Sequence, residues 1–388
     1  MKLKSALALA AALALATSHS FAQTQGVSKN EIVLGSIQDL SGPIAAFGKQ
    51  VRFGMQLRVD ELNEQSGGIN GRKIKLLIED SQWDPKKAVL ATQKLVNQDK
   101  IFAMVAHLGT TSNLASMPIQ FAKNVPNLSP ITASKEMYEP FHKLKFGFTA
   151  SYFDQMRIYL PKLVKEKNAK TVCTTYQDDD FGTEVMQGAE AGLKTIGMSL
   201  AEKTTFKTGA TDFSSQVARM KAANCDLVVL GTTIRDTIGT IGTSKRSGFN
   251  PVFFGSVAAY TDLIHKLGTR AMDGLYATMT VENPYLDAAS QPVRFWATKY
   301  QTKFGEEPTV FSVYGYAAID NFITAAQKAG PNLTTDGFIK ALEATVIPSD
   351  IFGSPEVRFG PNKRQGSNVT RLSQIQEGKW KIISDYAN

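Results

Sequence analysis

Histidine, cysteine and the glycine-rich motifs of many enzymes are scarce in this chain of 388 residues. It has four His and two Cys, and only His107, His142 and His265 follow residue 22. No His-Glu-x-x-His or Cys-x-x-Cys motif is present to bind zinc. The chain also lacks a Gly-x-x-x-x-Gly-Lys phosphate loop, a Gly-x-Ser-x-Gly nucleophile elbow and a Gly-x-Gly-x-x-Gly turn after its first strand. We therefore expect no cofactor, no metal ion and no catalytic activity.

Charge is not concentrated in one part of the sequence. The net charge is +8 at pH 7, but the Lys and Arg residues are scattered along amphipathic segments such as 161–167. Solvated helix faces explain them better than a nucleic-acid surface does. The acidic run Asp178–Asp180 could imitate a metal or acid–base cluster. Because consecutive side chains diverge, we interpret this run as a solvated loop.

Long hydrophobic runs are absent after the first residues. Met1–Lys4 is basic, residues 6–16 are an unbroken Ala/Leu run, and Ser20-Phe21-Ala22 supplies the small residues of a cleavage site. This pattern is typical of a secretory signal peptide, and the run is too short to span a bilayer. No Cys follows it, so we expect no lipid anchor. Cleavage after residue 22 would leave 388 − 22 = 366 residues, exported to a bacterial periplasm.

The two cysteines, Cys173 and Cys225, each lie in or beside an expected strand. The oxidising compartment of an exported protein permits a disulfide. Both positions are apolar, however, and a free buried Cys is common in such surroundings. Strand spacing alone cannot satisfy disulfide geometry. We therefore expect two free thiols and keep the disulfide as the alternative.

What the chain has in abundance is an alternation of apolar strand-like runs with amphipathic helical segments. Strands are expected at 31–37, 73–79, from 101, at 125–129, 145–149, 170–176, 199–205, 226–230 and 252–255. Helices of ~10–15 residues between strands indicate βαβ units, a parallel sheet and right-handed crossovers. The pattern restarts after the fifth strand. We therefore predict an α/β fold of two doubly wound, Rossmann-like lobes, followed by three helices and, beyond residue 352, β-hairpins.

The stretch Ile101–Asn113 is the most suggestive of a binding site. Its apolar run ends in the small, hydroxyl-rich turn 109–112, and a helical segment follows at once. Open α/β sheets bind ligands outside the carboxyl ends of their strands. The free N–H groups of a first helical turn also favour an anion or a carbonyl oxygen. The alternative is an ordinary connection in which Thr and Ser only cap the helix.

Six motifs are spread over nearly the whole chain after residue 22, and they are specific only in combination. They are Leu40-Ser-Gly-Pro-Ile-Ala-Ala-Phe-Gly48, Asn63-Glu-Gln-Ser-Gly-Gly-Ile-Asn-Gly71, Glu79-Asp-Ser-Gln-Trp-Asp-Pro-Lys-Lys-Ala88, Ser129-Pro-Ile-Thr-Ala-Ser134, Asp178–Gly182 and Tyr314-Gly-Tyr-Ala-Ala318. Together they resemble the periplasmic binding proteins of ABC importers, and among these the leucine/isoleucine/valine-binding family.

The resemblance implies a type I binding fold, in which two lobes joined by three hinge crossings close over a solute. Lobe 1 would comprise residues 28–147 plus 281–351, and lobe 2 residues 148–280 plus 352–388. The chain would cross near Phe148, Met279 and Phe352. The implied partners are a small solute and the permease subunits of the importer. We expect a monomer that binds no nucleic acid.

The resemblance also implies where the ligand would lie. In the family, a Ser/Thr turn after the third strand and the backbone after Ser-Pro hold the ligand carboxylate. Here these positions are Thr110 and Thr111, followed by Ile131, Thr132 and Ala133. Phe47 of the first loop would cover the ligand. Lobe 2 would contribute Phe181, Thr233 and Val257. Tyr152 and Phe311 would add apolar wall, and each of the four aromatic residues could instead be ordinary core.

Two positions depart from the amino-acid binders of this family. Those proteins place a carboxylate after the strand that ends here at Gly255, and it pairs with the ammonium of the ligand. Val257 holds that position here, and Thr233 stands where Tyr is frequent. An ammonium buried without a counter-charge costs several kcal/mol, so a plain α-amino acid is disfavoured. Arg235 could reach an acidic ligand, or it could be a surface residue at a helix start.

We therefore predict a periplasmic receptor without catalytic activity, which captures a small apolar or aromatic carboxylate and delivers it to a permease. A sensor or regulator of the same fold is one alternative. A binder of an amino acid or an amide is another. An exported α/β enzyme is the least favoured, because the chain shows no motif for a nucleophile and its base.

Overall fold

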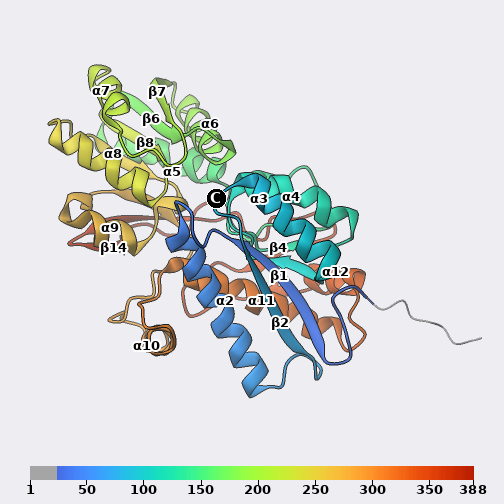
Figure 1. The fold of residues 1–388 in the computed structure, drawn as a ribbon. Coiled ribbons are helices and arrows are strands. Elements are labelled where there is room, and N and C mark those ends of the chain that lie inside the picture. Colours follow the sequence, from blue (N-terminus) through green and yellow to red (C-terminus); the bar gives the residue numbers. More distant parts are fainter. Residues whose placement is uncertain (1–23) are drawn as a thin grey trace, which may run out of the picture.

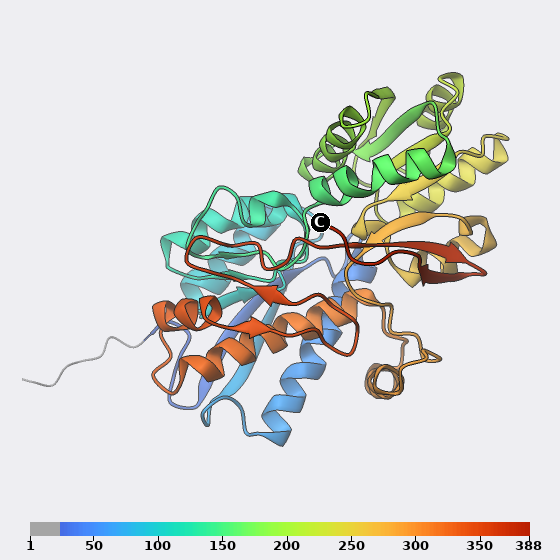
Figure 2. The ribbon, with the colours of Figure 1, turned by 180° about the vertical axis from the view of Figure 1, so that it is seen from behind.

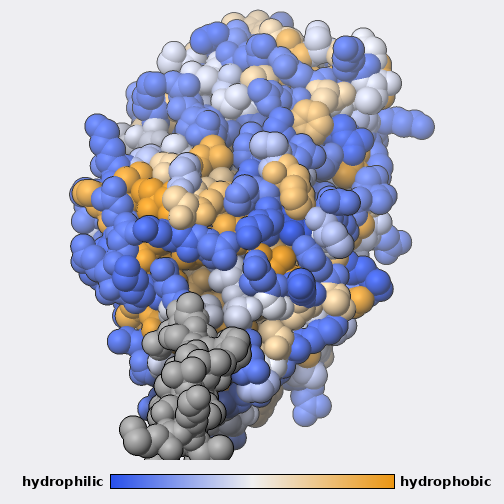
Figure 3. Space-filling view, turned by 90° about the vertical axis from the view of Figure 1, so that its right-hand side faces the viewer, coloured by the Kyte–Doolittle hydropathy of each residue, from blue (hydrophilic) through white to orange (hydrophobic). Residues whose placement is uncertain are grey.

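The computed structural model describes residues 24–388. The predicted signal peptide, residues 1–22, lies outside this range. Within the described part of the chain, no helix combines the length and the apolar character needed to cross a membrane. The face drawn in Figure 3 is mostly hydrophilic, and hydrophobic residues lie on it in small groups.

The first lobe is built on a parallel sheet with the strand order β2–β1–β3–β4–β5. Its strands are β1 (Glu31–Gln38), β2 (Lys73–Asp80), β3 (Ala103–Val105), β4 (Asn127–Leu128) and β5 (Lys145–Phe146). The helices between the first four strands are α2 (Ala45–Gln65), α3 (Pro85–Gln93), its π-helical continuation η1 (Lys94–Gln98) and α4 (Thr110–Ala122). As its sequence indicates, α3 starts at a capping Asp84, whose carboxylate accepts the N–H of Lys86 at 2.8 Å.

The second lobe is built on a sheet with the strand order β14–β13–β10–β9–β8–β6–β7. Its parallel strands are β6 (Val172–Gln177), β7 (Leu200–Phe206), β8 (Leu227–Gly231), β9 (Val252–Gly255) and β10 (Tyr276–Met279). The hairpin of β13 (Arg371–Gln376) and β14 (Lys379–Ile382) extends it in antiparallel fashion. Its helices are α5 (Tyr152–Lys167), α6 (Asp180–Lys194), α7 (Ser214–Ala222), α8 (Ile234–Arg246) and α9 (Asp262–Gly268). The predicted α/β class with two parallel sheets is confirmed (Figure 1).

After β10 the chain returns to the first lobe, which gains α10 (Gln291–Phe304), α11 (Val310–Ala329) and α12 (Thr335–Glu343). α11 packs against α2 so closely that both helices need glycine at the contact. A Cβ on Gly54 would lie 1.9 Å from the carbonyl oxygen of Ser312, and one on Gly315 would lie 2.2 Å from that of Val51. Figures 1 and 2 show α11 beside the first sheet, away from the second.

Three stretches of chain join the lobes, and the C-terminus lies at their junction (Figure 2). The first stretch follows β5 and the second follows β10, beside Phe148 and Met279. Near the C-terminus, the hydroxyl of Tyr386 donates to the carbonyl oxygen of Thr280 at 2.8 Å. The end of the chain is therefore tied to one of the crossings.

The third crossing lies later than the predicted position at Phe352. The strand that follows Phe352 is β12 (Val357–Arg358), and it pairs with β11 (Val346–Ile347) rather than with the second sheet. The guanidinium of Arg364 bonds Glu343 at 2.7 Å, and the N–H of Gly366 donates to the carbonyl oxygen of Gly147 at 2.7 Å. Residues 352–366 thus pack on the first lobe, and we place the crossing between Gly366 and β13. The rest of the division into lobes stays a prediction.

The expectation of two free thiols is wrong, because Cys173 and Cys225 form a disulfide with their Cα atoms 5.9 Å apart. Cys173 lies on β6 opposite Val228 of β8, and Cys225 lies just before β8. Pairing of neighbouring parallel strands thus brings the two Cα atoms within the usual range of roughly 4.4–6.8 Å. The order of the strands, which the sequence pattern does not contain, decides this contact.

Candidate functional site

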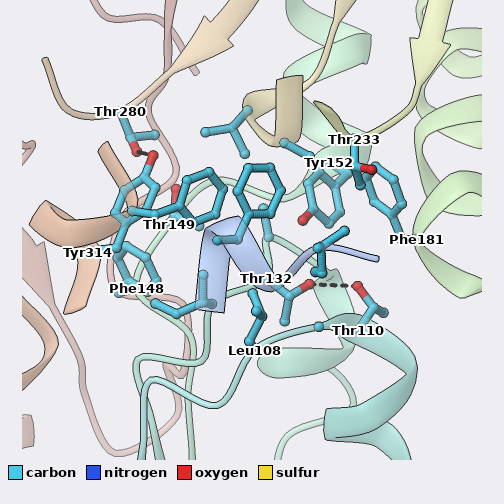
Figure 4. A pocket seen from close by; sticks show the side chains of 18 of the residues that line it. Leu108, Thr110, Thr132, Phe148, Thr149, Tyr152, Phe181, Thr233, Thr280 and Tyr314 are labelled. Atoms are coloured by element: carbon cyan, nitrogen blue, oxygen red, sulfur yellow. Dashed lines mark hydrogen bonds between the residues drawn. The ribbon is translucent and has the colours of Figure 1, made fainter. Parts of the chain in front are cut away.

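A cavity lies between the lobes, at the carboxyl ends of strands from both sheets. Its volume is about 60 Å³. The residues that line it (Figure 4) are Ile44, Phe47, Trp83, Leu108, Gly109, Thr110, Ile131, Thr132, Ala133, Phe148, Thr149, Tyr152, Phe181, Thr233, Val257, Ala258, Thr280, Phe311 and Tyr314.

The turn after β3 forms the polar end of the cavity. Gly109 has φ 95°, and a Cβ there would lie 2.6 Å from the Trp83 ring, so the position requires glycine. α4 begins at the next residue, Thr110, and the N–H groups of its first turn have no intrahelical acceptors. The Thr110 hydroxyl lies 2.7 Å from that of Thr132 (Figure 4). This end can donate hydrogen bonds to a ligand oxygen, and the helix dipole favours a negatively charged one.

The loop after β4 holds Thr132 in position. The N–H of Ile131 donates to the carbonyl oxygen of His107 at 2.8 Å, which joins the loop to the β3 turn. The Thr132 hydroxyl also accepts the N–H of Ser134 at 3.2 Å. On the other side, the N–H of Tyr152 donates to the carbonyl oxygen of Ala133 at 2.7 Å. The protein itself therefore fixes the two threonine hydroxyls.

Aromatic rings form much of the remaining wall. Phe47 of α2 and Phe311 of α11 are stacked, with ring centroids 3.8 Å apart. Tyr152 of α5 and Phe181 of α6 meet edge to face at 4.9 Å. The first pair belongs to the first lobe and the second pair to the second lobe. An apolar ligand between the lobes would thus contact rings from both sides.

The second lobe presents few free polar groups to the cavity. Thr233 is the N-cap of α8, and its hydroxyl donates to Asp236 at 2.9 Å in a capping box. The N–H of Val257 donates to the side-chain oxygen of Gln155 at 3.0 Å. The hydroxyl of Thr233 and the N–H of Val257 are thus engaged within the protein, and the Val257 side chain adds apolar surface.

The lining contains no Asp, Glu, Lys, Arg or His side chain among residues 24–388. Burial raises the pKa of Tyr152 to about 12 and raises that of Tyr314 as well, so both hydroxyls are neutral at ordinary pH. Glu184 of α6 is buried but does not line the cavity; it accepts the N–H of Lys135 at 3.0 Å. Burial, with the charge of Glu136, raises the pKa of Glu184 to about 7. The described residues also contain no His, Cys, Asp or Glu group suited to a metal ion.

Comparison with known proteins identifies the family of this chain. A family model described as periplasmic binding protein matches residues 31–379. The chain belongs to this family. It is thus a periplasmic substrate-binding protein of the ABC transporter class, and the predicted relationship to the Leu/Ile/Val-binding proteins is confirmed.

Proteins similar to this periplasmic binding protein in sequence or in fold bind different solutes. The Leu/Ile/Val/Thr-binding protein of Salmonella typhimurium is 25% identical over 271 residues, which are 70% of this chain and 72% of that protein. A fatty acid ABC transporter substrate-binding protein from Thermomonospora curvata has the same fold, with a TM-score of 0.84, 22% identity and 94% of each chain covered. A solute-binding protein from R. palustris, solved in complex with benzoate, has a TM-score of 0.80 and 17% identity, with 91% of this chain and 96% of that chain covered. Membership of the family therefore leaves the solute open.

The structure brings most of the predicted site residues of this binding protein together. Those that line the cavity are Phe47, Thr110, Ile131, Thr132, Ala133, Tyr152, Phe181, Thr233, Val257 and Phe311. Their role in binding stays a prediction, but their shared position follows from the fold.

Thr111 and Arg235 do not line the cavity. The Thr111 hydroxyl donates to Asp180 of the second lobe at 3.0 Å, and Arg235 is exposed on α8. Thr111 follows Thr110, and Arg235 lies two positions after Thr233. Both Thr110 and Thr233 lie at the start of a helix and line the cavity. Because successive helical positions turn by about 100°, neighbouring side chains at such a start point in different directions.

The interpretation of Asp178–Asp180 as a solvated loop agrees with the structure for most of the run, because Asp178 and Asp179 precede α6 and both Asp178 and Asp180 are exposed. Asp179 caps α6, and its carboxylate accepts the N–H of Gly182 at 3.0 Å. Asp178 forms an ion pair with Lys207. The run is therefore a loop that leads into the first residue of α6.

Several lining residues were missed. Leu108 and Gly109 precede the threonine turn and Ala258 follows Val257, so a wider reading of the strand ends would have included them. Tyr314 belongs to a motif that supports the family resemblance. Ile44 and Trp83 also belong to such motifs, at 40–48 and 79–88. Those without a comparable local signal are Phe148, Thr149 and Thr280.

Proposed function

We propose that this protein captures a small apolar carboxylate, foremost an aromatic acid, and hands it to the permease subunits of an ABC importer. The observation that carries the proposal is the absence of an acidic side chain from the cavity lining within residues 24–388. An α-amino acid would bring an ammonium group into this space without a counter-charge, which costs several kcal/mol. A carboxylic acid without an amino group avoids that cost.

The polar end supports binding of the carboxylate. Because the hydroxyls of Thr110 and Thr132 are bonded to each other, one of them has a free proton, and the ligand oxygens would accept it together with the N–H groups at the start of α4. Hydrogen bonds to a charged group contribute roughly 1.5–3 kcal/mol each. No cationic side chain lines the cavity within the described range, so the anion would be stabilised by dipoles and hydrogen bonds.

The aromatic wall supports an apolar body behind the carboxylate. The stacked pair of Phe47 and Phe311 and the pair of Tyr152 and Phe181 belong to opposite lobes. The space of about 60 Å³ suits a compact molecule. A relative of the same fold binds benzoate, which agrees with the chemistry of this lining.

Closure around the ligand follows from contacts that both lobes make with it. A solute that bonds the α4 turn and packs on rings of the second lobe favours the closed arrangement, because it gains both sets of contacts only there. The hydrogen bond from Thr111 to Asp180 and the ion pair of Lys266 with Glu307 also link the lobes. The closed form would be the one that a permease recognises, and we propose that a monomer suffices.

A thermal-shift comparison of benzoate, benzamide and leucine tests this function. At a hundredfold excess over its dissociation constant, a ligand stabilises the folded protein by about 2.7 kcal/mol. We expect a clear shift with benzoate, a smaller one with benzamide, which lacks the negative charge, and none with leucine. A larger shift with leucine than with benzoate would instead indicate an amino-acid binder. Chemical turnover of a bound compound would indicate an enzyme.

A further inference from the structure

A second cavity lies directly behind the wall of the first. Its volume is about 400 Å³, against about 60 Å³ for the ligand cavity. It runs along α11 and under the loop between β11 and β12. Four residues, Phe148, Thr149, Thr280 and Tyr314, line both cavities, so a single layer of side chains separates them.

This shared wall lies at the far end of the ligand cavity from the polar turn. Figure 4 shows the pair Thr110 and Thr132 on one side and the pair Thr280 and Tyr314 on the other. An acid whose carboxylate is held at the turn would therefore direct the rest of its skeleton toward the wall. Any part that exceeds the small cavity would meet these side chains.

The wall is not tightly bonded. The hydroxyls of Thr280 and Tyr314 are 3.3 Å apart, which is longer than the usual range of roughly 2.5–3.0 Å for a bond between hydroxyls. Within residues 24–388, the buried hydroxyl of Thr149 has no hydrogen-bond partner. A buried hydroxyl without a partner costs free energy, so it destabilises this arrangement of the wall. Phe148 meets Tyr314 edge to face at 5.8 Å. Phe148 and Thr280 also lie on crossings between the lobes, so hinge motion can move them.

The second cavity offers an apolar surface. Both acidic residues of its lining already have partners: Asp320 bonds Arg58 at 2.7 Å, and Asp350 accepts the N–H of Phe352 at 2.9 Å. The remaining surface includes Tyr316, Ala317, Ile347, Phe352 and Val357. This chemistry suits a hydrocarbon chain, and the lining formed by residues 24–388 has no cationic side chain to bind an anion.

We propose that the second cavity is a subsite for the apolar tail of a longer acid, which enters when the Phe148–Tyr314 wall opens. This inference rests on the proposed function, since the carboxylate must be held at Thr110. It extends the accepted solutes from compact aromatic acids to acids with an alkyl chain opposite the carboxylate.

Isothermal titration calorimetry with benzoate, para-butylbenzoate and para-hexylbenzoate tests the subsite. In the wild-type protein, affinity is expected to rise along this series by roughly fourfold for each CH₂ group buried. Ala317→Trp would place a large ring in the second cavity only. This variant is expected to lose the gain from the alkyl chain while it binds benzoate within about twofold of wild type.

The matched control is Ala222→Trp, an exposed position on α7, which is expected to leave all three affinities unchanged. If Ala317→Trp does not fold, Thr324→Trp from the same cavity wall serves instead. Wild-type protein that binds benzoate but rejects both alkylbenzoates would overturn the subsite alone. So would an equal loss of all three ligands in the folded tryptophan variants. Failure of benzoate and both alkylbenzoates to bind would overturn the proposed function, and the subsite with it.

Discussion

The two lobes offer different chemistry to the same cavity. In the first lobe, the turn at Thr110 and the loop at Thr132 present hydroxyls and N–H groups. In the second lobe, the hydroxyl of Thr233 is bonded to Asp236, and Val257 presents a hydrocarbon surface. Under the proposed function, the first lobe recognises a carboxylate. The second lobe disfavours an ammonium group, because the described residues that line the cavity include no acidic side chain to pair with it. Specificity then depends on what one side lacks as much as on what the other provides.

The largest effect is expected from making the second lobe resemble an amino-acid binder. In Val257→Asp, a buried carboxylate would face the carboxylate of the ligand, and repulsion of two such charges in a protein reaches roughly 4 kcal/mol at 4 Å. We expect benzoate affinity to fall by about 100-fold or more, measured by calorimetry on protein whose circular dichroism spectrum is unchanged. The control is Val257→Asn, of similar size and without charge. An equal loss in both variants would assign the effect to packing.

The next largest effect is expected from removing the anchor in the first lobe. Thr110→Val keeps the shape of the side chain but removes a hydrogen bond to a charged oxygen, which contributes roughly 1.5–3 kcal/mol. Benzoate affinity should fall by about 10- to 100-fold in a titration. Thr92→Val removes a buried hydroxyl that donates to the carbonyl oxygen of Ala88, away from the cavity, and should leave affinity unchanged. Full affinity of the Thr110 variant would mean that this turn is only a helix cap.

A smaller effect is expected from the neighbouring threonine. Thr111 does not line the cavity, but its hydroxyl bonds Asp180 across the lobes at 3.0 Å. Thr111→Val should weaken benzoate binding by only about two- to fivefold, because it removes one exposed bond that favours this arrangement of the lobes. The same titration series measures it. A loss as large as that of Thr110→Val would show that Thr111 contacts the ligand, as the family pattern suggests.

The least effect on affinity, with a measurable effect on stability, is expected at Glu184. Burial and the charge of Glu136 raise its pKa from the ordinary 4.5 to about 7. The folded state thus holds this proton more tightly than the unfolded state, so the stabilisation is present below about pH 4.5 and is lost as the pH rises through about 7. Urea unfolding should show that wild type loses more stability than Glu184→Gln between about pH 4 and pH 8. Equal losses in the two proteins would contradict the raised pKa.

Strand ends were the most predictable part of the site. Thr110, Thr132, Thr233 and Val257 all follow a strand of a parallel sheet, and the carboxyl ends of such strands gather at one edge. A sequence pattern can therefore assign them to the same cleft. The position of a strand end does not predict the direction of a side chain in the helical turn that follows. The sequence therefore predicts Thr111 and Arg235 as site residues, although neither lines the cavity.

Contacts that depend on strand order or on the relation between lobes were not predictable. The disulfide of Cys173 and Cys225 requires β6 and β8 to be neighbours, although β7 lies between them in the sequence. Phe148 and Thr280 join the cavity wall from the crossings that follow β5 and β10. The predicted position of the third crossing is too early because the short strand β12 pairs with β11 on the first lobe. Each of these strands has two residues, too few to show a hydrophobic alternation in the sequence.

The central claim is that the cavity accepts a carboxylate and refuses an ammonium. Phenylpropanoate and phenylalanine test it most directly, because they share one skeleton and differ only in the α-ammonium group. Calorimetric titration of the wild-type protein with both compounds at neutral pH is predicted to show phenylpropanoate binding at least about 100-fold more tightly, since an unpaired buried ammonium costs several kcal/mol. Equal affinities, or tighter binding of phenylalanine, would contradict the account.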